Sequence, residues 1–310
     1  MTTPGPAPVG PDQQIQCLVA EMVKKRPMLE NLLLPFSALF IEKTRLAAAL
    51  KAELNPAQIP ISPKRLSEGV PILAGISFDS LKPALDRAFV ALVPVLKAAF
   101  PALAFDLDRM EAAQRNASLE LNRLAETYWE SRLEGLRETP ALPEAGQVSV
   151  VFVVNLVIST VLQSLAPSVA GWVGDLQWDR GYCPVCGSLP CISYLSKPQV
   201  SSSEFLVGGG GQRYLHCTLC GQDWRVPRHL CAACERDDTD EHMYFHVPDA
   251  VGERVDICRH CGHYLPCIDL RELDALPHLD TISVGLAHLD MLAQEKGFSP
   301  MVWTPWNTFE

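Results

Sequence analysis

Apolar positions recur at helical spacing through most of the first half of the chain. The clearest set is Leu85, Ala88, Phe89, Leu92 and Leu96, which would line one face of a helix. An apolar stripe also predicts a helix over residues 107–136. A helix capped by Asp12 and ending near Lys25 is expected as well, followed by a helical region over residues 29–54 with a break or kink near Pro35. Residues 55–80 contain four prolines and are predicted to form a long loop.

The most apolar run of the chain, residues 148–165, contains no charged side chain. Its length is near the lower limit for a membrane-spanning helix, and its valines also permit a strand. The polar side chains of Asn155, Ser159, Thr160 and Gln163 argue against a span exposed to lipid. We therefore predict a buried helix in a bundle, without stable membrane insertion.

The pattern changes near Gly181, where short apolar stretches begin to alternate with paired cysteines. Ten of the eleven cysteines lie between Cys183 and Cys267. Eight of them form the CxxC pairs Cys183/Cys186, Cys217/Cys220, Cys231/Cys234 and Cys258/Cys261. Two intervening residues let a tight turn direct both sulfur atoms at one ion, and two such turns complete a tetrahedral site. Four pairs therefore predict two closed tetrathiolate metal sites.

The order of the pairs suggests how they combine. Sequential grouping places Cys183, Cys186, Cys217 and Cys220 around one ion, and Cys231, Cys234, Cys258 and Cys261 around the other. Crossed grouping would interleave the two modules, so the sequential arrangement is the one we expect. Four thiolates suit zinc and a single rubredoxin-type iron equally well. The ligands alone thus leave open both the metal and whether it only stabilises the fold or also carries electrons.

The remaining cysteines and histidines near the pairs are interpreted as non-ligands. Each predicted site already has four thiols, so packing is the expected role of Cys17, Cys191 and Cys267, and no metal is assigned to His216 or His260. Glycine follows three of the pairs, at positions 187, 221 and 262. Glycine tolerates positive φ, which favours tight turns at these positions.

Composition and charge narrow the functional classes. Of 310 residues, 48% are hydrophobic and 20% are charged, which is typical of a folded soluble protein. The formal net charge is −10, of which −2 falls in residues 1–180 and −8 in residues 181–310. An acidic second half repels phosphate, which argues against nucleic acid as a partner. No basic segment followed by an apolar core opens the chain, so we expect the reducing cytoplasm, where paired cysteines hold metal.

Motifs of common enzyme classes are missing from the sequence. It contains no GxGxxG, GxxxxGK[ST], HExxH or GxSxG pattern. Nor does anything indicate a metal site with three ligands and an open position for water. We therefore expect a protein that is not an enzyme.

The expected architecture is multi-domain and mainly α. An α-helical domain over residues 1–180, with a loose N-terminal tail, precedes two small rubredoxin-like or zinc-ribbon β modules, and a C-terminal helix ends the chain. The predicted boundaries place the modules at 181–229 and 230–275, and the helix and tail at 276–310.

The residues around the cysteines resemble those of one family. The segments CPVCGSLP, RYLHCTLC, CAACE and CRHCGHYL are similar to the formate dehydrogenase accessory protein FdhE family, and the likeness extends over about residues 182–305. It implies a cytoplasmic maturation factor whose two rubredoxin-like modules bind iron. It also implies, as partner, the catalytic subunit of a respiratory formate dehydrogenase before export. Cys191 and Cys267 depart from the family pattern, but the eight predicted ligand cysteines are all present.

Two other functions remain as alternatives to this maturation role. One is a zinc-ribbon protein that binds nucleic acid, against which the acidic second half argues. The other is an electron carrier that uses an Fe(Cys)4 centre, which the same ligands would support.

Overall fold

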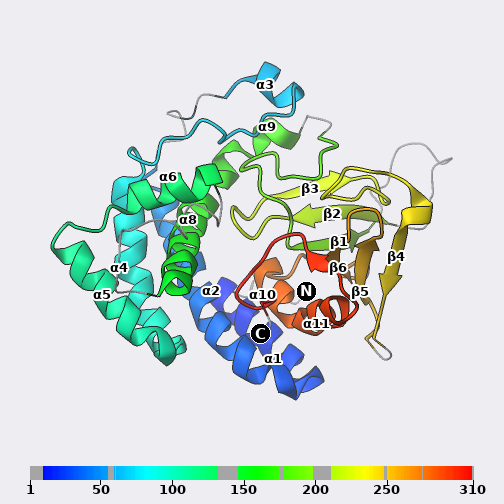
Figure 1. Cartoon of the computed structure of the whole chain (residues 1–310), viewed down its shortest axis with the longest axis horizontal. Helices are drawn as coiled ribbons and strands as arrows, with labels where there is room; N and C mark the ends of the chain where they lie inside the picture. Colours follow the sequence, from blue (N-terminus) through cyan, green and yellow to red (C-terminus); the bar gives the residue numbers. More distant parts are fainter. Residues whose placement is uncertain are drawn as a thin grey trace, which may run out of the picture.

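The chain divides into a helical half and a half built on a β-sheet, with the last helices packed between them (Figure 1). A computed structural model describes residues 10–54, 59, 61–131, 146–174, 178–197, 211–247, 250–273 and 275–308. The helices of the first half are α1 (Pro11–Lys25), α2 (Glu30–Lys51), α3 (Pro63–Ser67), α4 (Lys82–Ala99), α5 (Ala104–Arg115), α6 (Leu121–Ser131), α8 (Gln147–Val169) and α9 (Gly171–Gly174). Short 3₁₀ helices precede α2 at Pro27–Leu29 and α5 at Pro101–Leu103.

The apolar run predicted to be a buried helix forms α8, which lies among α2, α4, α5 and α6. By length and composition α8 is apolar enough to cross a membrane, but 72% of its most apolar window is buried inside the fold. Its polar side chains also have partners within the protein. The Asn155 amide, for example, donates to the Tyr128 hydroxyl at 2.6 Å. These features are those of a core helix.

The single helix predicted over residues 107–136 is wrong. Helix α5 ends at Arg115, Ala117 takes a φ of +58°, and α6 begins at Leu121; residues 132–136 lie outside the described part of the chain. The cause is local, because the Asn116 side chain accepts hydrogen bonds from the backbone N–H and the hydroxyl of Ser118. Such side-chain bonds compete with the helical pattern and favour a turn.

Two further predictions of secondary structure need correction. Within the predicted long loop, residues 63–67 form α3, whose N-cap Ser62 accepts a hydrogen bond from the Arg65 N–H. The expected C-terminal helix is two helices, α10 (Leu279–Gly285) and α11 (Ala287–Glu295), which meet at Leu286. Gly285 at this bend lies directly against the Met22 side chain of α1, which would have to shift to admit a β-carbon.

The second half folds around one seven-stranded sheet. Its strands are β1 (Ile192–Ser196), β2 (Gln212–His216), β3 (Asp223–Val226), β4 (His242–Phe245), β5 (Glu253–Cys258), β6 (His263–Asp269) and β7 (Ser299–Pro300). The order is β3-β2-β1-β6-β5-β4, with β7 beside β6. Strands β1 and β6 pair in parallel, with Ser193 opposite Cys267, and this pairing makes the sheet continuous across the two predicted modules. The domain boundaries themselves stay a prediction.

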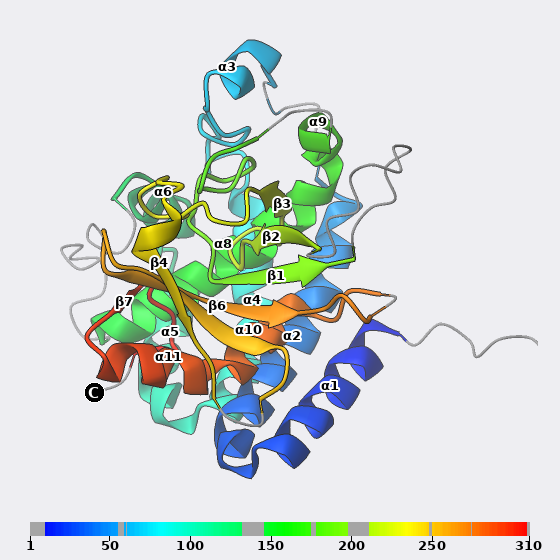
Figure 2. The same cartoon turned by 90° about the vertical axis from the view of Figure 1, so that its right-hand side faces the viewer.

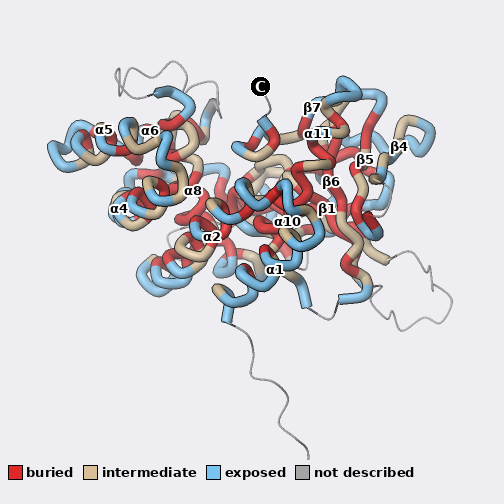
Figure 3. The backbone as a smooth tube through the Cα atoms, turned by 90° about the horizontal axis from the view of Figure 1, so that it is seen from below, coloured by how far each residue is buried: buried red, intermediate tan, exposed pale blue. Residues whose placement is uncertain are grey.

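The C-terminal helices cover one face of the sheet (Figure 2). Ile282 and Leu289 pack there against Ile192, Val255 and Tyr264 in a separate apolar cluster. Buried positions continue from α8 and α2 through α10 into β1 and β6 (Figure 3). The fold is thus confirmed: a mainly helical N-terminal region precedes a β-sheet that carries the two tetracysteine sites.

Candidate metal centres

All four CxxC pairs adopt the same backbone turn. In each, the residue after the second cysteine donates its N–H to the carbonyl of the first: Gly187 to Cys183, Gly221 to Cys217, Glu235 to Cys231 and Gly262 to Cys258, at 2.7–2.9 Å. That residue has a positive φ in every turn, between 57° and 75°. The preference for glycine there is therefore explained at three positions.

Glu235 is the exception, a non-glycine residue held at a φ of +57°. Its carboxylate has partners that a glycine would lack. It accepts from the Gly181 N–H at 3.0 Å and lies 3.4 Å from the Arg180 guanidinium. These contacts tie the third turn to the start of the first module and offset part of the cost of the left-handed backbone.

Site one gathers the thiols of Cys183, Cys186, Cys217 and Cys220. The Sγ atoms of Cys183 and Cys220 lie 3.5 Å apart, and those of Cys186 and Cys217 lie 3.4 Å apart. A tetrahedron with metal–sulfur distances of about 2.3 Å needs sulfur–sulfur distances of about 3.8 Å. The arrangement therefore fits one tetrahedral ion after a small outward movement of the thiols.

Site two gathers the thiols of Cys231, Cys234, Cys258 and Cys261. The Sγ atoms of Cys231 and Cys261 are 3.7 Å apart, and those of Cys234 and Cys258 are 3.8 Å apart. These distances match a tetrahedral ion directly. The structure thus brings together the two sets of thiols that sequential grouping describes; the binding of metal to them remains a proposal.

The protein environment shifts the pKa of the thiols at both sites. Burial raises the pKa of Cys183 and Cys220 well above the usual thiol value, and burial raises the pKa of Cys261 to about 11. At Cys186 and Cys234 hydrogen bonds outweigh the effect of burial and lower the pKa. A divalent ion would hold all four thiols of a site as thiolates. Backbone N–H groups of Ser188, Arg236 and His263 already donate to ligand sulfurs, at Cys186, Cys234 and Cys261.

Comparison with known proteins finds similarity to FdhE proteins over part of the chain. A model of the FdhE central domain matches residues 182–228. The "Protein FdhE homolog" of Aquifex aeolicus is 33% identical over 122 residues, and "Protein FdhE" of Salmonella choleraesuis is 34% identical over the same length. The chain is thus similar to FdhE proteins in its cysteine-containing part. These alignments cover 39% of this chain and only 40% and 35% of the two relatives.

Similarity of fold extends over the helical half as well. The crystal structure of the FdhE protein from Pseudomonas aeruginosa superposes with a TM-score of 0.56 and covers 94% of this chain and 93% of its own. Its sequence identity is 22%, so this likeness concerns the fold alone. FdhE-type architecture is thus shared from the first helices to the C-terminal ones.

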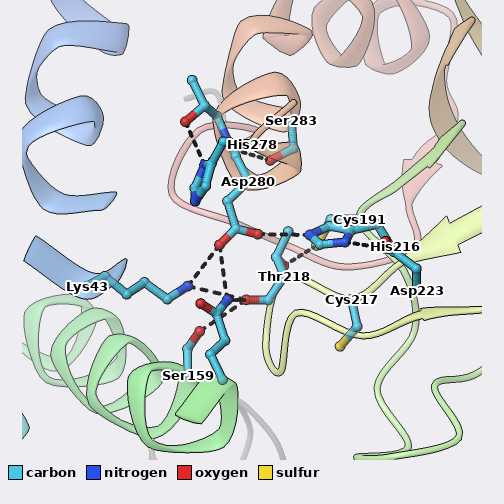
Figure 4. Close-up of polar contacts among 12 residues, drawn as sticks. Lys43, Ser159, Cys191, His216, Cys217, Thr218, Asp223, His278, Asp280 and Ser283 are labelled. Carbon is cyan, nitrogen blue, oxygen red and sulfur yellow. Dashed lines mark hydrogen bonds and ion pairs between the residues drawn. The ribbon is translucent and has the colours of Figure 1, made fainter. Parts of the chain in front are cut away.

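A buried polar network joins site one to the helices of the first half (Figure 4). The carbonyl of Thr218, between ligands Cys217 and Cys220, accepts from the Ser159 hydroxyl at 3.0 Å and the Gln163 amide at 3.3 Å. The ammonium of Lys43 lies 3.5 Å from the same carbonyl and 3.0 Å from the Asp280 carboxylate. Sequence reasoning missed this network.

His216 belongs to the same network and uses both ring nitrogens within it. Nδ1 lies 2.6 Å from Asp223 and Nε2 lies 3.0 Å from Asp280. Although burial lowers the pKa of His216, its hydrogen bonds to the two carboxylates raise it to about 10. His216 is therefore a charged partner of Asp280, and its position next to Cys217 brings that charge close to site one.

The three other cysteines occupy different environments. Cys191 is half-buried, with its Sγ 2.9 Å from the Thr218 hydroxyl, and Cys267 is buried on β6. Cys17 is exposed, so the expectation that it packs in the core is wrong. The buried face of α1 is formed instead by Ile15 and Val19, four residues apart.

Proposed function

We propose that this protein is a cytoplasmic accessory factor of the FdhE type, which binds the immature catalytic subunit of a respiratory formate dehydrogenase. The observation that carries the proposal is the pair of tetracysteine sites, of which site one lies within residues 182–228 that match the FdhE central domain, in a chain that is similar to curated FdhE proteins over 122 residues. Cytoplasmic action accords with cysteines paired for metal, since this compartment disfavours disulfides.

The eight cysteines would hold two metal ions, for which iron is favoured by the family resemblance and zinc also fits the ligands. A bound ion would link two turns of the sheet and supply folding free energy, which is about 10–16 kcal/mol in zinc-finger peptides. Four thiolates complete the coordination sphere and leave no position for substrate. We therefore propose a scaffold for a client protein and no catalysis.

A gene deletion tests the assignment. Cells lacking the protein should lose formate-dependent dye reduction while still making the catalytic polypeptide. The wild-type gene should restore activity, and full activity in the deletion strain would contradict the proposal. Co-purification of the catalytic subunit from anaerobic extracts tests the partner, and metal analysis of the same sample distinguishes iron from zinc.

Two measurements address the alternatives. A salt-dependent gel shift with DNA or RNA at near-physiological ionic strength would support a zinc-ribbon function, which the net charge of −8 in residues 181–310 disfavours. A visible absorbance that bleaches on reduction, together with electron transfer to a partner, would support an Fe(Cys)4 carrier.

A further inference from the structure

The two tetracysteine sites differ in their enclosure. At site one all four cysteines are at most 2% exposed, and they belong to the same apolar cluster as the core leucines of α2, α4 and α8. At site two Cys234 and Cys261 are partly exposed. A metal ion at site one would therefore lie inside the core that the helical half provides, whereas an ion at site two would lie close to solvent.

The helical half holds both turns of site one by hydrogen bonds. In the first turn, the N–H groups of Ile72 and Leu73 donate to the carbonyls of Pro184 and Val185, each at 2.9 Å. In the second turn, the Thr218 carbonyl is the shared acceptor for donors from α2 and α8 (Figure 4). Neither turn can move away from its metal position without breaking these bonds.

Buried charges make this junction cooperative. Lys43 on α2 and Asp280 on α10 are at most 4% exposed and form an ion pair, and the Gln163 amide donates to the same carboxylate at 3.1 Å. Removing one member of a buried pair leaves an uncompensated charge, so partial opening is strongly unfavourable. Helices α2 and α8 are therefore expected to leave site one and α10 together.

We infer that site one exchanges its metal only when the helical half separates from it, while site two exchanges with the fold closed. The first ion must then enter before the helices dock, and docking traps it. This inference rests on the proposed binding of metal at both sites. The two sites would then differ in function: site one would hold a fixed ion, and site two would hold an exchangeable ion.

Metal transfer from the zinc-loaded full chain to a chromogenic chelator tests the inference. Two zinc equivalents should leave in two phases of equal amplitude, and the slow phase should be site one. Cys261→Ser, which damages site two, should leave only the slow phase. Two ions released at one rate would overturn the inference alone; a chain that holds no zinc or iron would overturn it together with the metal-site proposal.

A matched pair of variants on α8 tests the mechanism. Ser159→Ala removes a hydrogen bond that exists only in the docked state, and its slow phase should become about five-fold faster with the fast phase unchanged. Ser164→Ala removes an equally buried hydroxyl whose bond, to the Val161 carbonyl, stays within α8 when the junction opens. Its slow phase should match wild type. Equal effects of the two variants would overturn the mechanism, and the wild-type phases remain decisive if a variant fails to fold.

Discussion

Asp290 of α11 should make the stability of this protein depend on pH in an unusual direction. The side chain is 2% exposed, and Oδ1 accepts a hydrogen bond from the Tyr264 hydroxyl at 2.9 Å. Burial raises the pKa of Asp290 from 3.8 to about 7, and hydrogen bonds from Tyr264 and Asn307 offset only part of this effect. The folded protein therefore keeps a proton on Asp290 in a pH range where the unfolded chain has lost it.

The size of the effect follows from the two pKa values. A difference of about three units corresponds to about 4 kcal/mol. Because the folded-state pKa is the higher one, the contribution of Asp290 is fully present below about pH 4 and is lost as pH rises through about 7. Asp290→Asn removes the ionisation and keeps an oxygen to accept from Tyr264. The variant should gain stability relative to wild type as pH rises, by up to about 4 kcal/mol at pH 8.

Urea unfolding followed by circular dichroism between pH 5 and pH 8 measures this difference. Comparing variant with wild type at each pH cancels the proton uptake of the metal sites, which both proteins share. Asp269→Asn is the control, with a stability change expected in the opposite direction. A hydrogen bond from Arg271 lowers the pKa of Asp269, so removing the Asp269 charge should destabilise the folded state at neutral pH. A stability difference for Asp290→Asn that does not change with pH would refute the reasoning.

Three further outcomes are expected. Cys231→Ser should lose one metal equivalent and keep site one, whereas Cys267→Ser should keep both; mass spectrometry under native conditions counts the ions, and two ions in Cys231→Ser would contradict the ligand set. Lys43→Met should lower the free energy of unfolding by about 1–3 kcal/mol, because Asp280 loses the bond from the ammonium and keeps only His216 and Gln163 as partners. Gly181→Ala should lower the melting temperature by several degrees, because a β-carbon there would overlap the backbone of Ala232. Gly171→Ala is the control, because a β-carbon at Gly171 has no atom within 4 Å. Equal melting temperatures for the two variants would show that the overlap at Gly181 is harmless.

The sequence predicted what depends on short-range pattern. Two residues between cysteines define a turn, so the eight thiols and their grouping followed from spacing, as α8 followed from its apolar run. The polar junction could not be predicted in this way, because Lys43 and Asp280 are 237 positions apart and each resembles an ordinary surface residue in isolation. The break after α5 did carry a local signal, the Asn116 and Ser118 pair, but the apolar stripe that continues across it concealed the turn.

The parallel pairing of β1 with β6 limits how this protein can be divided. A fragment of residues 181–229 would keep both turns of site one but would lose β6, and with it the neighbour of one whole side of β1. A strand edge with unpaired backbone groups is a template for intermolecular pairing. The segment that matches the FdhE central domain is therefore expected to aggregate when produced alone, and the shortest soluble piece should extend at least to Asp269.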